Sequence, residues 1–538
     1  MRWRLSAGIL PALVLVLVLL LRFGPVAAQE TPIIGYNAIH HPVVARHGMV
    51  VSADGIASRA GLEILRAGGN AVDAAVAVGF ALAVTVPRAG NIGGGGFMLV
   101  YLAKEKRTVA IDYREMAPAA AGRDMFLDAA GNVDGGRSRF THLASGVPGT
   151  VAGLLHALDR YGTMSRRQVM APAIRLAREG FAIGFGLADS LKRAQQRLSR
   201  DADARAIFFK PDGGLYDYGE TLVQRDLAAT LSRIADQGAP GFYGGETARM
   251  IAAEMKAGGG LITTADLAAY RAVERQPVRG TFHGYEVVAM PPPSSGGVHI
   301  IEMLNILEGY RLRELGHNSA RTIHLMAEAM KHAYADRSEY LGDPDFYKVP
   351  VARLTARDYA ATIRASIDPE RARPSTDIAP GRLAVYESPQ TTHFSLMDRF
   401  GNAVSNTYTL NLSYGSGYVV KGAGFLLNNE MDDFSAKPGV PNAFGLLGNK
   451  ANAIAPGKRP LSSMTPTLIF RDGKPVVVTG SPGGGRIINA VLQVALNVMA
   501  FDMNIAAAVA VPRIHHQWLP DVLWMEPGIS PDTVRLLQ

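Results

Sequence analysis

The chain contains no cysteine among its 538 residues. This absence excludes disulfide bonds, zinc sites with cysteine ligands and a thiol nucleophile. Blocks of lysine or arginine interleaved with aromatic residues are also missing, so the sequence does not indicate binding to nucleic acid. Apolar residues make up 48% of the chain. A protein of this length with that composition can bury a large core without covalent cross-links.

The N-terminus has the pattern of a secretory signal peptide. Arg2 and Arg4 precede an apolar run over residues 7–21, and small residues follow up to Ala28. This order predicts export and cleavage after Ala28, and therefore a periplasmic or secreted protein. The apolar run is shorter than the roughly 20 residues that cross a bilayer. We expect a membrane contact only if the segment remains uncleaved.

The remaining sequence predicts one large domain, because no linker, low-complexity run or internal repeat divides it. Helical spacing dominates residues 149–270. Apolar residues at helical spacing also predict helices over 56–65, 71–84, 298–308, 319–340 and 487–500. Alternation predicts strands at 98–102, 109–113 and 279–289, and hairpins formed by 392–398 with 403–410 and by 467–470 with 475–479.

Residues with reactive or polar side chains are concentrated in the hundred positions after Gln390. Thr391 and Thr392 begin an alternating strand, and further motifs follow at 409–411 (TLN), 428–433 (NNEMDD), 460–466 (PLSSMTP) and 481–485 (SPGGG). Together they provide a hydroxyl nucleophile, amides, carboxylates, paired serines and a glycine turn. These are the groups that an acyl-transfer site requires.

These motifs, in this order, resemble those of the γ-glutamyltranspeptidase family. The upstream motifs at 91–97 (NIGGGGF), 112–118 (DYREMAP) and 291–297 (PPPSSGG) extend the resemblance from about Gly35 to the last residue. It implies an α/β (α+β) N-terminal nucleophile hydrolase with a four-layer αββα sandwich. The implied activity is transfer of the γ-glutamyl group of glutathione and related compounds to water, amino acids or peptides, without a cofactor or a metal.

The resemblance also implies a precursor that cuts itself between Gln390 and Thr391. We expect residues 29–390 and 391–538 to remain together as a large and a small subunit of one domain. A threonine hydroxyl needs a nearby base, and an α-amine titrates at about pH 7.7–8.0. Cleavage would therefore give Thr391 its nucleophile and its base together. In the family, the threonine that matches Thr409 hydrogen-bonds the nucleophile and assists processing.

The resemblance assigns the substrate contacts residue by residue. A γ-glutamyl group carries an α-carboxylate and an α-ammonium, so its site needs both charge signs. An arginine fork can offer a carboxylate two parallel donors. The residues that match the carboxylate site are Arg114, Ser462 and Ser463, and those that match the ammonium site are Asn411, Glu430 and Asp433.

Gly483 and Gly484 match the oxyanion hole of the family, which backbone N–H groups form. A glycine turn before a helix can instead bind phosphate, but the lysine-containing ending of a phosphate loop is missing. The motif at 91–97 is read as close backbone packing for the same reason. The pairs His40-His41 and His515-His516 do not predict a metal site, because neighbouring side chains on a strand point to opposite faces.

Two other functions fit the same motifs. A glutaryl or cephalosporin acylase would use this scaffold, although its substrates lack the ammonium that Asn411, Glu430 and Asp433 would bind. A non-cleaving protein that binds γ-glutamyl compounds is the second. The sequence also departs from the family: Phe444 replaces a lid tyrosine, and the chain ends at Gln538, where relatives continue. Either the sequence is a fragment or the protein lacks a sheet edge. If the natural chain ends there, we expect reduced stability and failed self-cleavage.

Overall fold

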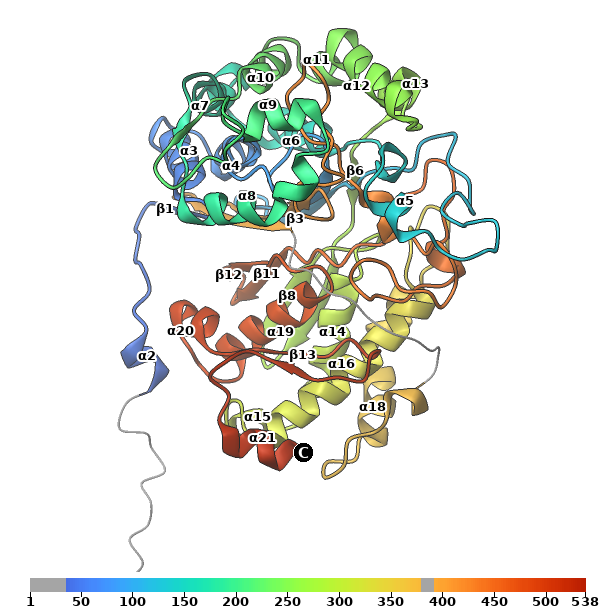
Figure 1. The fold of residues 1–538 in the computed structure, drawn as a ribbon. Coiled ribbons are helices and arrows are strands. Elements are labelled where there is room, and N and C mark those ends of the chain that lie inside the picture. Colours follow the sequence, from blue (N-terminus) through green and yellow to red (C-terminus); the bar gives the residue numbers. More distant parts are fainter. Residues whose placement is uncertain (1–34, 379–390) are drawn as a thin grey trace, which may run out of the picture.

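A computed structural model of the chain describes residues 35–378 and 391–538. Two antiparallel sheets lie face to face in the middle of the molecule, and helices cover the outer face of each (Figure 1). This is the four-layer arrangement that the sequence predicted. The expected signal peptide and Gln390 lie outside the described residues.

The first sheet has six strands in the order β1-β9-β10-β2-β3-β6. All of its neighbouring strands are antiparallel. Their bounds are β1 Gly48–Ser52, β2 Gly95–Leu102, β3 Arg107–Tyr113, β6 Val273–Arg275, β9 Thr392–Asp398 and β10 Ala403–Thr409. The predicted hairpin after Thr391 is therefore the centre of this sheet.

The second sheet has the order β12-β11-β8-β7. Its strands are β7 Val278–Phe282, β8 Tyr285–Ala289, β11 Thr467–Arg471 and β12 Lys474–Thr479. The single strand predicted over 279–289 is wrong, because His283 and Gly284 both have positive φ and turn the chain into a hairpin. Alternation of apolar residues continues through this turn, so the pattern alone did not reveal it.

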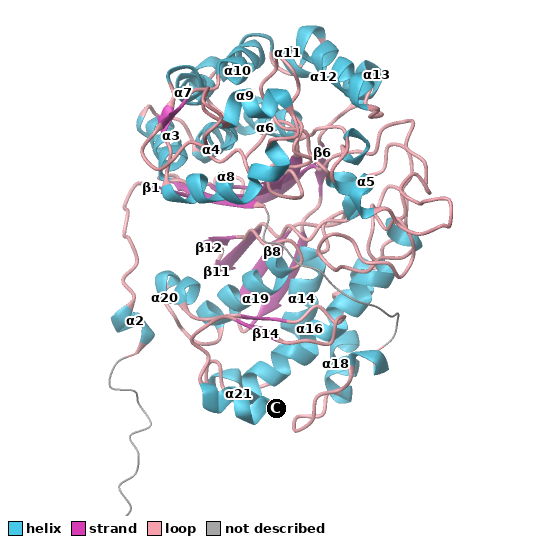
Figure 2. Cartoon of the chain, in the orientation of Figure 1, coloured by secondary structure: helices cyan, strands magenta, loops and turns pink. Residues whose placement is uncertain are grey.

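Helices of the first half of the chain cover the first sheet, and later helices cover the second (Figure 2). The first group is α3 Gly55–Arg66, α4 Ala71–Thr85, α6 Thr150–Tyr161, α7 Arg166–Glu179, α8 Phe185–Leu198, α9 Ala202–Phe208, α10 Arg225–Gln237, α11 Pro240–Tyr243, α12 Gly245–Gly258 and α13 Thr264–Ala269. The second group is α14 Gly296–Leu307, α15 Leu312–Leu315, α16 Ala320–Tyr340, α17 Val351–Leu354, α18 Arg357–Ser366, α19 Arg486–Met499, α20 Ile505–Ala510 and α21 Pro531–Leu537.

Smaller elements complete the described chain. They are α2 Tyr36–Ile39, α5 Gly135–Arg139, β4 Phe181–Ala182, β5 Thr221–Leu222, β13 Ile514–His515, β14 Trp524–Met525 and the short 3-10 helices His142–Ala144, Ser375–Asp377, Glu430–Asp433 and Lys450–Asn452. None of the helices in residues 35–378 and 391–538 combines the length and apolarity needed to cross a membrane.

Helix α4 illustrates how composition determines the core. Every one of its residues is buried, and its alanines and valines let it lie close to β9 and β10. A helix that is apolar on all sides is stable only inside a protein. Asn70 and Asp73 begin this helix with a capping box, which satisfies N–H groups that would otherwise be buried without partners.

Both sheets combine strands from before and after Thr391. In the first sheet β9 and β10 are inserted between β1 and β2, and in the second β11 and β12 pair beside β8. Ladder hydrogen bonds therefore join residues 35–378 to residues 391–538 in each layer. Each of the two main hydrophobic clusters contains residues from both parts of the chain.

Candidate active site

Thr391 lies at the entrance to the central strand β9, between the two sheets. Its backbone has φ +106°, a conformation that β-branched residues rarely adopt. The side chain is buried, and its Oγ1 lies 3.3 Å from Oγ1 of Thr409 at the end of β10. The hairpin therefore brings the two hydroxyls predicted to act together into contact.

The backbone that follows Thr409 turns sharply toward the substrate-binding candidates. The N–H of Asn411 donates to Thr409 Oγ1 at 3.0 Å, and Asn411 has φ +73°. Its Nδ2 donates to the carbonyl of Asn429 at 2.9 Å. Its Oδ1 is buried and has no hydrogen-bond partner among the described residues, so an acceptor faces the site.

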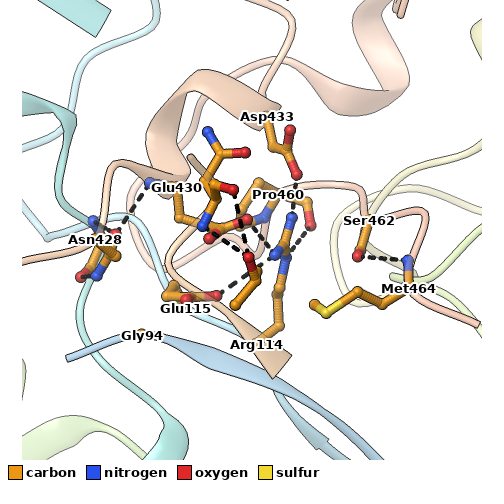
Figure 3. Close-up of polar contacts among 12 residues, drawn as sticks. Gly94, Arg114, Glu115, Asn428, Glu430, Asp433, Pro460, Ser462 and Met464 are labelled. Carbon is orange, nitrogen blue, oxygen red and sulfur yellow. Dashed lines mark hydrogen bonds and ion pairs between the residues drawn. The ribbon is translucent and has the colours of Figure 1, made fainter. Parts of the chain in front are cut away.

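Arg114 is fully buried and lies between two carboxylates (Figure 3). One terminal nitrogen pairs with Glu430 and the other with Asp433. Its Nε donates to the carbonyl of Pro460 at 3.1 Å. Although burial disfavours its charge, the coulombic attraction of the two carboxylates raises the pKa of Arg114. The guanidinium is therefore charged and fixed in one orientation.

Burial also changes the acidic groups around Arg114. It raises the pKa of Glu430 and of Asp433, and Arg114 opposes both changes. Burial raises the pKa of Glu115 to about 7, and this carboxyl lies 3.6 Å from Arg114. Glu430 and Asp433 each contact the guanidinium directly, which favours the charged form of both carboxyls against the effect of burial.

Ser462 and Ser463 lie in the buried segment that follows Pro460, whose carbonyl accepts from Arg114. The N–H of Met464 donates to Ser462 Oγ at 3.0 Å. The buried Arg337 of α16 donates to Ser463 Oγ at 3.2 Å. Because these oxygens already accept hydrogen bonds, each hydroxyl proton is available to a ligand.

Gly483 and Gly484 form the turn that precedes α19. Their φ angles are +130° and +54°, which favour glycine. A Cβ on Gly484 would lie 2.5 Å from Cδ1 of Phe444. Phe444 therefore packs directly on this turn.

Two cavities meet at Thr391. A small one, of about 20 Å³, is lined by most of the predicted site residues. These are Thr391, Arg114, Thr409, Asn411, Glu430, Asp433, Ser462, Ser463 and Gly484. The other, of about 1230 Å³, has Thr391 and Gly483 in its wall. The fold thus gathers all ten predicted catalytic and substrate-binding residues around one hydroxyl.

The profile of the family described as Gamma-glutamyltranspeptidase matches residues 57–538. The chain belongs to this family. It is 56% identical over 520 residues to a glutathione hydrolase proenzyme of Escherichia coli (strain K12), with 96% of this chain and 89% of that protein covered. The prediction of family and of an enzyme from the motifs is confirmed.

Two solved structures are similar to this chain over most or all of their own length. The γ-glutamyltranspeptidase of Helicobacter pylori is 46% identical with a TM-score of 0.62, covering 64% of this chain and 99% of that chain. A cephalosporin acylase from Bacillus halodurans is 28% identical with a TM-score of 0.80, covering 96% of this chain and 90% of that chain. The predicted αββα architecture is confirmed.

Three residues of this γ-glutamyltranspeptidase site were not predicted from the sequence. Glu115 adds a buried carboxyl beside Arg114, and Arg337 adds a buried guanidinium beside Ser463. Asn428 accepts from the N–H groups of Gly146 and Glu430 and donates to the carbonyl of Gly93. Glu115 and Asn428 lie in motifs that the sequence had already indicated, whereas Arg337 does not. A Cβ on Gly93 would collide with the Leu426 carbonyl, which explains the glycine-rich motif by close packing.

The histidine pairs lie apart from Thr391. His515 contacts Asn489 and Gln517, whereas His516 contacts Asp521. Within the described part of the chain, no group of three or more histidine and acidic side chains has an arrangement that suits a metal ion.

Proposed function

We propose that this enzyme hydrolyses and transfers the γ-glutamyl group of glutathione and related γ-glutamyl compounds through an ester on Thr391. One observation carries the proposal. Thr391, the Arg114 charge cluster and Gly484 line one small cavity. It has room for about one water, so a γ-glutamyl group would bind there only as the surrounding side chains move apart, with its γ-carbonyl beside the Thr391 hydroxyl and the glycine turn.

The charged groups of the site would recognise the two charges of the glutamyl group. Its α-carboxylate would approach Arg114 and the hydroxyls of Ser462 and Ser463. Its α-ammonium would bind Glu430 and Asp433, and the free Oδ1 of Asn411 offers a third acceptor. The substrate carboxylate would share Arg114 with the carboxylates of Glu430 and Asp433. Binding of a third carboxylate there is favourable only if the ligand also brings a cation.

The chemistry begins at Thr391 Oγ1. Its proton passes to the α-amine that cleavage creates, and the oxygen bonds to the γ-carbonyl carbon. The N–H groups of Gly483 and Gly484 stabilise the oxyanion. The C–N bond then breaks as the ammonium returns the proton to the leaving amine. Water or a second amine attacks the ester, with the same α-amine as its base, and restores Thr391.

We propose that the precursor matures by the same hydroxyl. Thr391 Oγ1 would attack the carbonyl of Gln390, the peptide nitrogen would leave as the new α-amine, and water would hydrolyse the resulting ester. The products would be chains 29–390 and 391–538, following export and removal of residues 1–28. The interleaved strands of both sheets would hold the two chains together.

Denaturing electrophoresis and mass spectrometry of the wild type and Thr391→Ala test both steps. We expect two chains and hydrolysis of a γ-glutamyl anilide from the wild type, and one inactive chain from Thr391→Ala. A single chain from both proteins, with equal hydrolysis, would contradict the proposal. Binding of glutamyl peptides by an uncut wild type without turnover would instead support a binding protein.

A glutaryl acylase is the second candidate, and the likeness to a cephalosporin acylase favours it. The ammonium site argues for the γ-glutamyl activity, since Glu430 and Asp433 would face a glutaryl group with no cation. Equal kcat/KM for glutaryl and γ-glutamyl anilides would favour the acylase.

A further inference from the structure

The larger cavity beside Thr391 carries a strong positive charge. Among the described residues in its wall are four arginines and no aspartate or glutamate. The arginines are Arg88, Arg193, Arg197 and Arg200. They come from the segment after α4 and from α8 and its C-terminal end, so only the folded chain brings them together.

Arg197 is the most enclosed of them. Its Nη2 donates to the carbonyl of Ser413, and its guanidinium carbon lies 5.7 Å from the centre of the Phe140 ring. Its Nε is buried without a hydrogen-bond partner among the described residues. Burial lowers the pKa of Arg197 to about 10, so it is still a cation at neutral pH.

The neighbouring arginines do not neutralise the positive charge of Arg197. Arg200 lies one turn further along and lowers the pKa of Arg197 further by repulsion. Arg88 is half-buried, and its backbone carbonyl accepts from Tyr414 at 2.9 Å. Only Arg193 has a carboxylate partner in the described chain, Asp189 in the preceding turn of α8. A buried guanidinium that lacks a counter-ion is costly unless a ligand supplies one.

The position of Thr391 indicates which part of the substrate would enter the large cavity. Thr391 lines both cavities, and the small one holds the groups for the glutamyl part. The amine part of the substrate must then extend into the large cavity. An acceptor amine enters where the leaving amine departs, because ester formation and its reverse share one transition state.

We propose that Arg88, Arg197 and Arg200 form a subsite for a carboxylate on the leaving amine and on the acceptor. This inference rests on the proposed function. It predicts a preference for γ-glutamyl peptides with a free C-terminal carboxylate, and for amino acid or peptide acceptors over simple amines. A guanidinium fork binds such a carboxylate through paired donors.

Two chromogenic substrates test this subsite: γ-glutamyl-4-nitroanilide and γ-glutamyl-3-carboxy-4-nitroanilide, which differ in one carboxylate on the leaving group. The measured quantity is the ratio of their kcat/KM values. We expect Arg197→Gln to lower this ratio about tenfold, as loss of one hydrogen bond between charged groups does. Arg88→Gln and Arg200→Gln should lower it about two- to fivefold, because they are more exposed.

The controls separate charge from structure. Arg197→Lys should retain part of the ratio, and Arg313→Gln, on the exposed helix α15, should leave it unchanged. High salt should lower the ratio in the wild type more than in Arg197→Gln. An equal ratio in the wild type, Arg197→Gln and Arg88→Gln would overturn the subsite. Absence of hydrolysis of both anilides by the wild type would instead overturn the proposed function.

Discussion

Oγ1 of Thr391 and Oγ1 of Thr409 lie 3.3 Å apart at the adjoining ends of two paired strands. The N–H of Asn411 donates to the same Thr409 oxygen. The Thr391 hydroxyl donates to this oxygen as well, and the Thr409 hydroxyl itself donates to the carbonyl of Asn411 at 3.4 Å. By accepting this hydrogen bond, Thr409 holds the oxygen of the proposed nucleophile in place.

Replacing Thr409 with valine removes this hydroxyl with little change in shape. We expect self-cleavage and anilide hydrolysis to slow about 10- to 100-fold, since an unpaired buried partner costs about 1–3 kcal/mol. The time course of precursor loss on denaturing gels gives the first rate. Thr409→Ser keeps the hydroxyl and should retain most activity. Equal rates for the valine and serine variants would contradict the role.

Asp433→Asn tests the ammonium site, because it keeps the shape of the side chain and removes one charge beside Arg114. Breaking a buried ion pair costs about 3–5 kcal/mol, so we expect kcat/KM for a γ-glutamyl anilide to fall by a factor of about 10² or more. Hydrolysis of a glutaryl anilide should fall less. Asp472→Asn, in the exposed β11–β12 turn, is the control. A uniform loss on both substrates would refute the assignment.

A methyl group at Gly484 would collide with Phe444 and displace the turn that carries the proposed oxyanion donors. We expect Gly484→Ala to lower kcat by about 10²–10³, the usual effect of losing such a donor. Gly473→Ala provides a matched control, because Gly473 also has positive φ but nothing lies within 4 Å of its added Cβ. It should reduce stability without changing kcat.

Glu302 and Asp336 predict a pH dependence of stability. Burial raises the pKa of each to about 8, so the native state binds more protons than the unfolded state between about pH 4 and 8. The free energy of unfolding should therefore fall as pH rises through this window. Glu302→Gln removes one of the two groups and should reduce the fall by about 1 kcal/mol or more.

Thermal unfolding at pH 6 and pH 9 measures this effect. The midpoint should decrease less between the two values in Glu302→Gln than in the wild type. His299, which contacts Glu302 at 2.8 Å, has its pKa lowered to about 3 by burial and stays neutral throughout. Glu314→Gln, exposed on α15, should behave as the wild type. Parallel curves for all three proteins would refute the prediction.

The architecture and most of the site residues could be predicted from the sequence, because strand alternation and short motifs are local patterns. Alternation marked β9, β10, β11 and β12, and the motifs named every predicted site residue near Thr391. The role of Arg337 in the site could not be predicted from the sequence, for a physical reason. Arg337 lies in the last turn of the 21-residue helix α16, where an arginine predicts only a solvent-exposed face until tertiary packing buries it.

The large cavity was missed for the same reason. Arg88 and Arg197 are more than a hundred positions apart, and each alone resembles an ordinary surface arginine. The family motifs supply the residues proposed to bind the glutamyl group, and each of these motifs is a short sequence pattern. The amine side is built from helix α8 and from a segment after α4, and no local pattern joins them.

The position of β9 between β1 and β10 has a consequence for the chemistry. Chain ends usually fray, because their backbone has hydrogen bonds on one side or none. A chain that begins at Thr391 would pair with β10 from its second residue and with both β10 and β1 from its fourth. Its amine and hydroxyl would lose little entropy on reaching the transition state, since folding has already restricted their motion.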